Sequence, residues 1–287
     1  MMEPEWWRGP MVLPKTAVVE NVDAMLSTLA NARATYYPLG LRTAATAADH
    51  RKMALRRAVR RLDEAKTPGY AFATLRPRLW STALQQLGVH EPDFLARRLM
   101  PERECEAALA PANVSWLFEQ SLHWRMIAIG ALEGAGMHMH VDSPALSTWH
   151  VQLRGRKRWT LCPPPGDTTG SNCSTAILHA GQSVFYPAFY AHSTRTLDAG
   201  AVSLSRSLIT PGHAAHTAEE LSAYFGCGGD SESCDATVRG ANSDAYCNAG
   251  SYDVLCDAVR PCLRRLLLWG GSRYALGEQM PATRLDL

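Results

Sequence analysis

The stretch Gly136-Met137-His138-Met139-His140-Val141-Asp142-Ser143 contains two histidines and a carboxylate within five residues. One residue separates His140 from Asp142, and on a β-strand this spacing puts both side chains on the same face. An imidazole nitrogen and a carboxylate oxygen that point at one place are two of the three ligands in a 2-His-1-carboxylate site for non-haem Fe(II). The third ligand would be a histidine further along the chain, and His192 is the best placed. A His-x-Asp pattern alone is common, so the surrounding sequence decides its meaning.

The composition sets limits on the class of protein. The chain has 287 residues, 46% of them hydrophobic, which is enough for one substantial core with a small addition. The formal net charge of +2 gives no argument for nucleic acid from the chain as a whole. No run of about 18 apolar residues is present, so we expect no membrane-spanning helix. The first residues lack the apolar segment of a signal peptide.

The eight cysteines are concentrated toward the C-terminal end, and five of them follow residue 226. They form no Cys-x-x-Cys pairs, so a zinc site is not favoured. Disulfides among them would indicate an oxidising compartment. The triplets Asn113-Val114-Ser115 and Asn172-Cys173-Ser174 are formal glycosylation acceptors, whereas the missing signal sequence argues against secretion. The localisation therefore stays open, with the secretory pathway included.

The N-terminal part is predicted to mix helices with extended segments. Helices are expected near Val22 to Ala32, over Asp49 to Lys66 and over Leu79 to Leu87, and Tyr70 to Leu75 alternates like a strand. The basic residues of the second helix fall mostly off its apolar stripe. They are either a basic surface for an acidic partner or a solvated helix face, and the solvated face is the favoured interpretation.

From residue 122 the hydrophobic pattern changes to a period of two, in short runs broken by Gly and Pro. The predicted strands are Leu122 to Ile129, Met137 to Asp142, Ser147 to Leu153, Lys157 to Cys162, Gly181 to Tyr186 and Ala201 to Ile209. The third and fourth are expected to form a hairpin around Arg154-Gly155-Arg156. Many short strands indicate a sandwich or a barrel, and the double-sheet jelly roll of the cupins is one such fold. Further on, Tyr252 to Leu268 reads as an amphipathic helix broken at Pro261.

The predicted fold class is mainly β with flanking helices. Its core is a double-stranded β-helix (jelly roll, cupin-like), preceded by a helical segment and followed by a helical, Cys-rich extension. The expected division is residues 1–110 as an N-terminal helical and extended region that packs on the core, 111–212 as the catalytic core, and 213–287 as the C-terminal extension.

Five motifs in a fixed order resemble a known family. They are His140-x-Asp142, Gly155-Arg156-Lys157-Arg158-Trp159, Cys162-Pro163-Pro164, Gly181-Gln182-Ser183-Val184-Phe185-Tyr186-Pro187, and His192. This order is similar to that of the JmjC-domain (cupin-like) Fe(II)/2-oxoglutarate-dependent oxygenases. The similar region runs from about Trp124 to Ile209, roughly a third of the chain.

The resemblance implies a role for individual residues. His140, Asp142 and His192 would be the iron ligands and the catalytic centre, and Lys157 would bind the distal carboxylate of 2-oxoglutarate. Thr148, on the strand expected to pair with that of Lys157, and Ser205, on the last strand, are further candidates for the same carboxylate. The chemistry agrees, because a dicarboxylate that chelates iron at its keto-acid end needs a cation at its far end.

His138 competes with His140 as a ligand, since both lie on one face of the expected strand. A His-x-His pair of the kind found in other cupins is accompanied by a glutamate a few residues later, and residues 143–148 contain none. His138 is therefore expected to line the pocket or to support a ligand.

The resemblance implies a dioxygenase that uses Fe(II), 2-oxoglutarate and O2 and releases succinate and CO2. The Asp ligand tilts the expectation toward a hydroxylase acting on a protein side chain. Alternatives are an N-methyl-lysine demethylase, a nucleic-acid hydroxylase, or a non-catalytic cupin-like binding protein. The expected partner is a protein or peptide substrate, with no membrane and no indicated nucleic acid. The helix at 252 to 268 is a candidate homodimer element, or it packs on the barrel.

Overall fold

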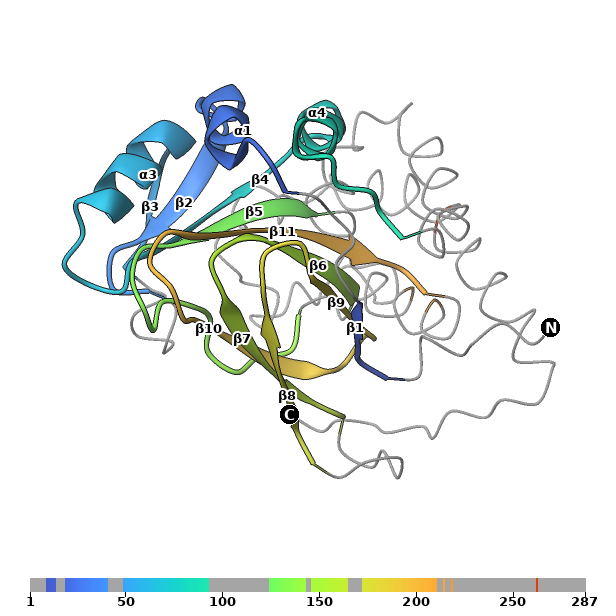
Figure 1. Ribbon diagram of the computed structural model, residues 1–287. Helices are drawn as coiled ribbons and strands as arrows, with labels where there is room; N and C mark the ends of the chain where they lie inside the picture. The colour runs from blue at the N-terminus through green and yellow to red at the C-terminus, as the bar shows by residue number, and fades with distance from the viewer. Residues whose placement is uncertain are drawn as a thin grey trace, which may run out of the picture. The chain divides into compact units, whose positions relative to one another are not determined.

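A computed structural model describes residues 9–13, 19–40, 49–92, 124–142, 146–164 and 172–210, with Ala214, Ala218 and Cys262 (Figure 1). The chain divides into two compact units. The first contains Met1–Asp93, Trp124–Asp142 and Ser147–Leu208, and the second contains Phe94–His123, Ser143–Leu146 and Ile209–Leu287. Nearly all described residues belong to the first unit, which holds every helix and strand named in this section.

Among the described residues of this unit, short helices are mixed with strands up to Leu87, and only strands follow from Arg125 on. In chain order they are β1 (Met11–Leu13), α1 (Val22–Thr28), β2 (Arg33–Tyr37), β3 (Arg51–Ala54), α3 (Leu55–Asp63), β4 (Tyr70–Thr74), α4 (Pro77–Leu87), β5 (Arg125–Gly130), β6 (Ser147–Arg154), β7 (Lys157–Cys162), β8 (Ser174–Leu178), β9 (Ser183–Tyr186), β10 (Ala191–Thr196) and β11 (Ala201–Leu208).

Two antiparallel sheets form the core. The larger has eight strands in the order β1-β9-β6-β11-β5-β4-β2-β3, and the smaller has the order β10-β7-β8. Along the chain, β5 and β6 lie in the larger sheet, β7 and β8 in the smaller, β9 in the larger, β10 in the smaller and β11 in the larger. Chain crossings of this kind between two facing sheets define a jelly roll. The predicted mainly-β, double-stranded β-helix fold is confirmed.

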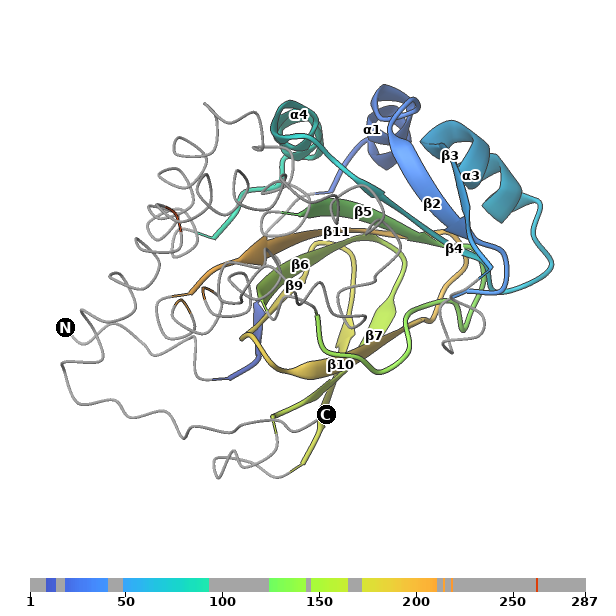
Figure 2. The same cartoon turned by 180° about the vertical axis from the view of Figure 1, so that it is seen from behind.

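The central strands of the larger sheet are buried on both faces. Helices α1, α3 and α4 lie along its outer side (Figures 1 and 2), and Trp80 of α4 meets Trp149 of β6 edge to face at 6.5 Å between ring centroids. All residues of β11 are buried. On that strand Val202 and Leu204 alternate with Ser203 and Ser205, so apolar side chains take one face and hydroxyls the other. The barrel interior is therefore lined by polar groups suited to a site.

The N-terminal residues contribute more than a covering layer. Strands β2, β3 and β4 extend the larger sheet beyond β5, and β1 pairs with β9 at the opposite edge. The strand expected over Tyr70 to Leu75 is β4, and the helices expected near Val22 and up to Leu87 are α1 and α4. The expected boundaries at residues 111 and 213 lie outside the described residues.

Three local expectations are wrong. Asp49 to Lys66 is not one helix, because Arg51–Ala54 pairs with β2 as strand β3 before α3 begins at Leu55. Strands β6 and β7 are not a hairpin: β6 pairs with β11 and β9, and β7 pairs with β10 and β8. The connection at Arg154-Gly155-Arg156 instead carries the chain from one sheet to the other. Gly155 has a φ of 69°, which suits a sharp change of direction.

The third error concerns Met137 to Asp142, which is not a regular strand. It touches β10 through an isolated bridge between His140 and His192. Met139 and Val141 remain exposed, at 45% and 46%, so this segment gains little from burial. It meets β10 at single residues: besides the bridge at His140, the carbonyl of Met137 accepts a hydrogen bond from the amide of Thr194 at 3.1 Å. The i, i+2 spacing of His140 and Asp142 nevertheless brings both side chains to one place.

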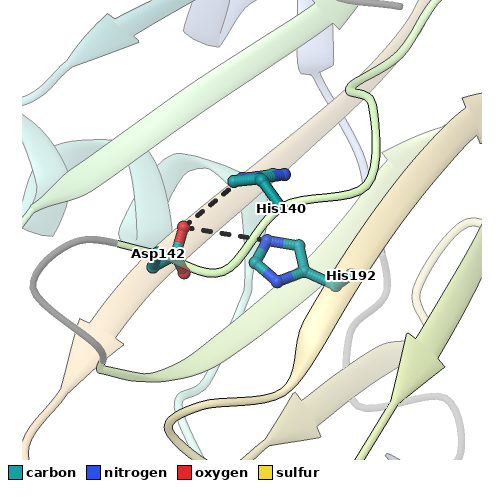
Figure 3. Close-up of side chains that lie close together, drawn as sticks. All are labelled: His140, Asp142 and His192. Carbon is teal, nitrogen blue, oxygen red and sulfur yellow. Dashed lines mark ion pairs between the residues drawn. The ribbon is translucent and has the colours of Figure 1, made fainter. Parts of the chain in front are cut away.

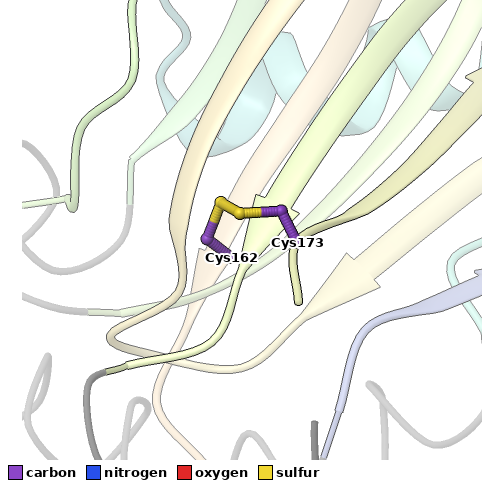
Figure 4. The surroundings of a disulfide bond; sticks show 2 residues. All are labelled: Cys162 and Cys173. Carbon is purple, nitrogen blue, oxygen red and sulfur yellow. A yellow bond between two sulfur atoms is a disulfide. The ribbon is translucent and has the colours of Figure 1, made fainter. Parts of the chain in front are cut away.

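One disulfide connects the end of β7 to the start of β8. Cys162 is bonded to Cys173, eleven residues later (Figure 4). The expectation that cysteines of this chain form disulfides is met for this pair, and the compartment that it would indicate stays a prediction. Among the described residues, no helix is both long and apolar enough to cross a membrane. The helix expected at 252 to 268 and its suggested dimer role fall outside the described residues, apart from Cys262.

Candidate metal centre

Three side chains from two segments converge inside the barrel. One ligand atom each of His140, Asp142 and His192 lies within 4.8 Å of the other two (Figure 3). The Oδ1 of Asp142 is 3.5 Å from Nε2 of His140 and 3.7 Å from Nε2 of His192. Donors that share an ion at bond lengths of about 2.0–2.2 Å are at most about 4.4 Å apart, so both pairs can reach one metal. The predicted convergence is confirmed.

Backbone hydrogen bonds hold the two histidines together. The amide of His140 donates to the carbonyl of His192 at 3.0 Å, and the amide of His192 donates back at 2.8 Å. This reciprocal pair brings the rings to 4.3 Å between centroids. The fixed backbone means that neither imidazole has to be recruited by a metal from a distance.

The same backbone sets the protonation of both rings. Nδ1 of His140 lies 2.8 Å from the carbonyl oxygen of His138, and Nδ1 of His192 lies 3.1 Å from that of Tyr190. A carbonyl can only accept, so each Nδ1 carries a proton, and in the neutral form of each ring the lone pair is on Nε2. Both lone pairs are on the nitrogens nearest Asp142. This is how metal-binding histidines are usually oriented.

Burial affects the two histidines differently. Desolvation lowers the pKa of His192, which keeps this ring neutral near pH 7. Desolvation also opposes charge on His140, but hydrogen bonds to Asp142 and to the carbonyl of His138 outweigh it and raise the pKa. The side chains of His140 and Asp142 are 20% and 18% exposed, whereas that of His192 is 5% exposed. The centre is therefore open to solvent on one side.

Two hydroxyl groups lie beside the ligands. Thr148 donates a long hydrogen bond of 3.4 Å to Oδ2 of Asp142, the oxygen that does not face the histidines. The hydroxyl of Tyr186 is 3.1 Å from Nε2 of His192. Thr148, predicted as a contact of the cosubstrate, thus supports the carboxylate ligand. The sequence predicts no role for Tyr186. Its position two residues after Val184 on an apolar strand puts both side chains on the same, inward face.

Lys157 is the only lysine among the described residues that is fully buried. Its ammonium donates to Oγ of Ser203 at 2.8 Å and lies 5.6 Å from the ring centroid of Tyr70. Burial lowers its pKa to about 7, and no described carboxylate forms an ion pair with it. A buried amine in this position favours an anionic ligand.

The serine of the last strand that contacts Lys157 is not the one that the sequence predicts. Ser203, which sequence reasoning missed, contacts Lys157, and the predicted Ser205 contacts Nδ1 of His150. The two serines share one face of β11, and only the distance between the facing sheets decides which meets the lysine. His150 is buried in the interior, and desolvation holds its pKa well below the usual value. Whether Ser205 reaches a ligand stays a prediction.

His192 and the buried lysine lie on neighbouring strands of the smaller sheet. His192 of β10 pairs with Leu161 of β7, and Lys157 lies four residues from Leu161 on the same face. At about 3.3 Å per residue, this is about 13 Å along the strand. Trp159 lies between them, with its ring 6.0 Å from that of His192.

His138 does not join the metal ligands. Its ring is 5.5 Å from that of His140 between centroids, and its carbonyl orients His140 by accepting the hydrogen bond from Nδ1. The expectation that His138 supports a ligand is therefore met by its backbone.

Comparisons with known proteins give matches only among solved structures. No protein-family model matches the chain, and no curated protein matches it. One structure of YcfD, a ribosomal oxygenase from Escherichia coli, is 16% identical with a TM-score of 0.43, covering 93% of this chain and 67% of that chain. Another, in complex with cobalt and succinic acid, is 11% identical with a TM-score of 0.39, over the same 93% and 67%. These scores are low, and the fold rests on the strand pairing of the two sheets.

Proposed function

We propose that the chain is an Fe(II)- and 2-oxoglutarate-dependent dioxygenase that hydroxylates a protein side chain. One observation carries the proposal: two imidazoles and a carboxylate converge on one point, and a buried lysine without a carboxylate partner among the described residues lies further along the strands of the smaller sheet.

The ligand set fits Fe(II). Two imidazole nitrogens and one carboxylate oxygen on one side of a metal leave the opposite positions open, which is typical of non-haem Fe(II) oxygenases. His140, Asp142 and His192 would hold the ion, and the carbonyls of His138 and Tyr190 would keep both rings in the ligating tautomer. The carboxylate would balance part of the ion's charge, as Thr148 steadies its second oxygen.

The lysine end fits the far carboxylate of 2-oxoglutarate. A carboxylate beside Lys157 would restore the charged ammonium that burial disfavours. Two further buried polar atoms lack a hydrogen-bond partner: Nε1 of Trp159, which shares the lysine's face of β7, and Oγ1 of Thr196, whose residue pairs with Lys157. Buried polar atoms are nearly always paired in native structures, so these two atoms could form hydrogen bonds with a ligand beside Lys157.

Bound together, Fe(II) and 2-oxoglutarate use O2 to oxidise a C–H bond, with succinate and CO2 as co-products. The chain positions the metal with three side chains, anchors the cosubstrate through Lys157 and excludes water from the lysine end by complete burial. The partial exposure of His140 and Asp142 leaves a side from which a peptide side chain can approach. The Asp ligand favours hydroxylation over demethylation by the family resemblance alone.

The first experiment measures the uncoupled reaction. Protein purified without oxygen and given Fe(II) should convert 2-oxoglutarate into succinate, and His140→Ala should not. His138→Ala is the matched control, because it removes the neighbouring imidazole and leaves the backbone carbonyl that orients His140. Equal succinate from His140→Ala and wild type would refute the oxygenase proposal.

The second experiment asks for the substrate. Active protein is offered peptide, N-methyl-lysine peptide and oligonucleotide libraries, and products are detected by a mass increase of one oxygen or the loss of a methyl group. Oxygen gain on unmodified peptides supports the proposed reaction. Demethylation, or oxidation of a nucleobase, would replace it by the corresponding alternative. Iron bound without any 2-oxoglutarate turnover would instead favour a non-catalytic binding protein.

A further inference from the structure

Helix α3 carries four arginines on its outward side. Leu55, Ala58 and Leu62 are buried and fix the helix on the sheet. The remaining positions include the pairs Arg56-Arg57 and Arg60-Arg61, of which only Arg61 is partly covered. We call these four residues the arginine face of α3. Two further exposed cations, Arg51 and Lys52, lie on the adjoining edge strand β3.

The arginine face lacks counter-charges. Within the described part of the chain, none of the four arginines forms an ion pair. Other arginines do: Arg154 pairs with Asp23 at 2.6 Å and Arg156 with Asp198 at 2.8 Å. Residues 49–66 hold seven Lys or Arg against three Asp or Glu, an excess of four positive charges in a chain whose total is +2. The charge is therefore local.

This arrangement works against the stability of the helix. Arg56 and Arg60 are four residues apart, as are Arg57 and Arg61, and like charges at this spacing repel. The helix dipole disfavours Arg56 and Arg57 in the first turn, which no side chain caps, and favours only Arg60 and Arg61 in the last turn. A helix face that is only exposed to water would suffer less electrostatic repulsion if positive and negative residues were mixed on it. The favoured interpretation from sequence, a solvated face, does not explain a single sign of charge.

The chemistry of the face selects a partner rich in phosphate. Arginine forms paired hydrogen bonds with phosphate oxygens, and the two arginine pairs are one helical turn, about 6 Å, apart. Protein partners usually dock on apolar or aromatic anchors. The large exposed hydrophobic side chains of the described residues are Val12, Leu39, Met139, Val141 and Ile177, none of them on α3 or β3. Cations without apolar anchors suit a sugar–phosphate backbone.

We propose that the arginine face of α3 binds the phosphate backbone of a nucleic acid without reading its sequence. It does so whether or not the oxygenase proposal is correct, because it uses residues of the N-terminal strands and helices and none of the metal centre. Arg51 and Lys52 on β3 extend the positive surface to the edge of the sheet.

The test measures binding of the full chain to fluorescent probes by anisotropy over a series of salt concentrations. The probes are a short oligouridine, a duplex DNA and a polyglutamate of matched charge. The variant is Arg56→Gln with Arg60→Gln, and the matched control is Arg158→Gln with Arg195→Gln, two exposed arginines that face each other on β7 and β10. Circular dichroism and thermal unfolding check that each variant is folded.

Wild type should bind oligouridine or duplex DNA, and the α3 variant should bind at least about 10-fold more weakly at low salt. The slope of log K against log salt should become less steep by about 1.4 for the single strand or about 1.8 for the duplex, because the variant loses two phosphate contacts. The control should keep its slope, and the difference between the two nucleic-acid probes tells which form is preferred. If the α3 variant were unfolded, Arg57→Gln with Arg61→Gln serves in its place.

Three results would overturn the proposal. One is the absence of nucleic-acid binding by wild type. Another is equal weakening by the control variant, which would mean non-specific attraction to any positive surface. The third is polyglutamate binding as tight as that of oligouridine and lost in the α3 variant, which would assign the face to an acidic protein.

Discussion

The two ends of the barrel interior differ in exposure and in charge. At one end His140 and Asp142 are about one-fifth exposed and supply an imidazole and a carboxylate. At the other end Lys157 is fully buried and supplies an amine. The open end can exchange a metal and admit a substrate, while the closed end can hold a charge only when an anion accompanies it. A ligand with a chelating end and an anionic end would satisfy both.

The same difference determines which changes should affect only ligand binding and which should also affect the free energy of unfolding. The ligand histidines are held by reciprocal backbone hydrogen bonds and cost the fold little. The buried amine, in contrast, is a burden on the ligand-free protein, since burial disfavours its charged form. We therefore expect changes at the open end to affect the metal and changes at the closed end to affect both the cosubstrate and the free energy of unfolding.

The largest effect is expected at the open end. Replacing Asp142 or His192 by alanine removes one of the three proposed ligands, and metal affinity should fall by more than about 100-fold. Mutating a residue that only supports a ligand typically lowers the affinity by about 10- to 100-fold. Iron content after anaerobic reconstitution measures the loss, with His138→Ala as the control that retains iron. Retention of iron by both ligand variants would mean that the ligating groups lie elsewhere.

Next in size is the loss of cosubstrate binding in Lys157→Met. Removing one partner of a buried charge pair commonly costs about 2–5 kcal/mol, so 2-oxoglutarate should bind at least about 30-fold more weakly. Iron binding should be unchanged, because the lysine lies about 13 Å along the strand from the level of His192. Titration with 2-oxoglutarate in the presence of iron checks both points. A parallel loss of iron would remove the distinction between the two ends.

Stability should depend on pH through the same lysine. Its folded pKa of about 7 lies below the ordinary 10.5, so the unfolded chain binds more protons between these values. The free energy of unfolding should therefore rise with pH, by about 2–3 kcal/mol between pH 7 and 9, and the burden is fully present below pH 7. Urea unfolding of the metal-free protein measures this rise. Lys157→Met should be more stable than wild type at pH 7 and should lack that part of the rise. Identical slopes in the two proteins would mean that the amine is hydrated when folded.

The sequence predicted the ends of the barrel better than the elements that connect them. His140 and Asp142 could be found because alternation along a short segment reports which residues share a face, whereas Lys157 was found through the family resemblance of the motif around it. Ser203 could not be distinguished from Ser205, because both share a face and the meeting of β11 with β7 depends on the separation of two sheets. The pairing of β6 was mispredicted for a related reason. Adjacent strands in sequence usually form hairpins, and only the jelly-roll topology sends them to different sheets.

The composition of strand β3 made it hard to predict from the sequence. Arg51 to Ala54 runs directly into α3, and its charged residues continue the helical pattern, so one long helix was predicted. Pairing with β2 decides otherwise, and such pairing between distant segments has no local signal. The same basic residues suggested a surface role from sequence, but only the lack of ion pairs on α3 among the described residues gave that idea a physical basis.

The choice between the two serines can be tested directly. Ser203→Ala removes the hydroxyl that accepts from the Lys157 ammonium, and a hydrogen bond to a charged group contributes about 1.5–3 kcal/mol. The Michaelis constant for 2-oxoglutarate should change by about 10-fold in Ser203→Ala and by less in Ser205→Ala, whose hydroxyl contacts His150. A larger effect at Ser205 would show that the candidate expected from the sequence is the one that touches the cosubstrate.

The smallest effect is expected from Thr148, which sharpens the description of the open end. Its hydrogen bond to Asp142 is long, at 3.4 Å, so it steadies the carboxylate without holding it. Thr148→Val keeps the shape of the side chain and removes the hydroxyl, and metal affinity should fall by no more than about 10-fold, the lower limit for groups that orient a ligand. The Michaelis constant for 2-oxoglutarate, measured at saturating iron, should stay at the wild-type value. A change confined to that constant would return Thr148 to the role that the sequence suggests, a contact of the cosubstrate, and would bring the two ends of the interior closer together than the structure places them.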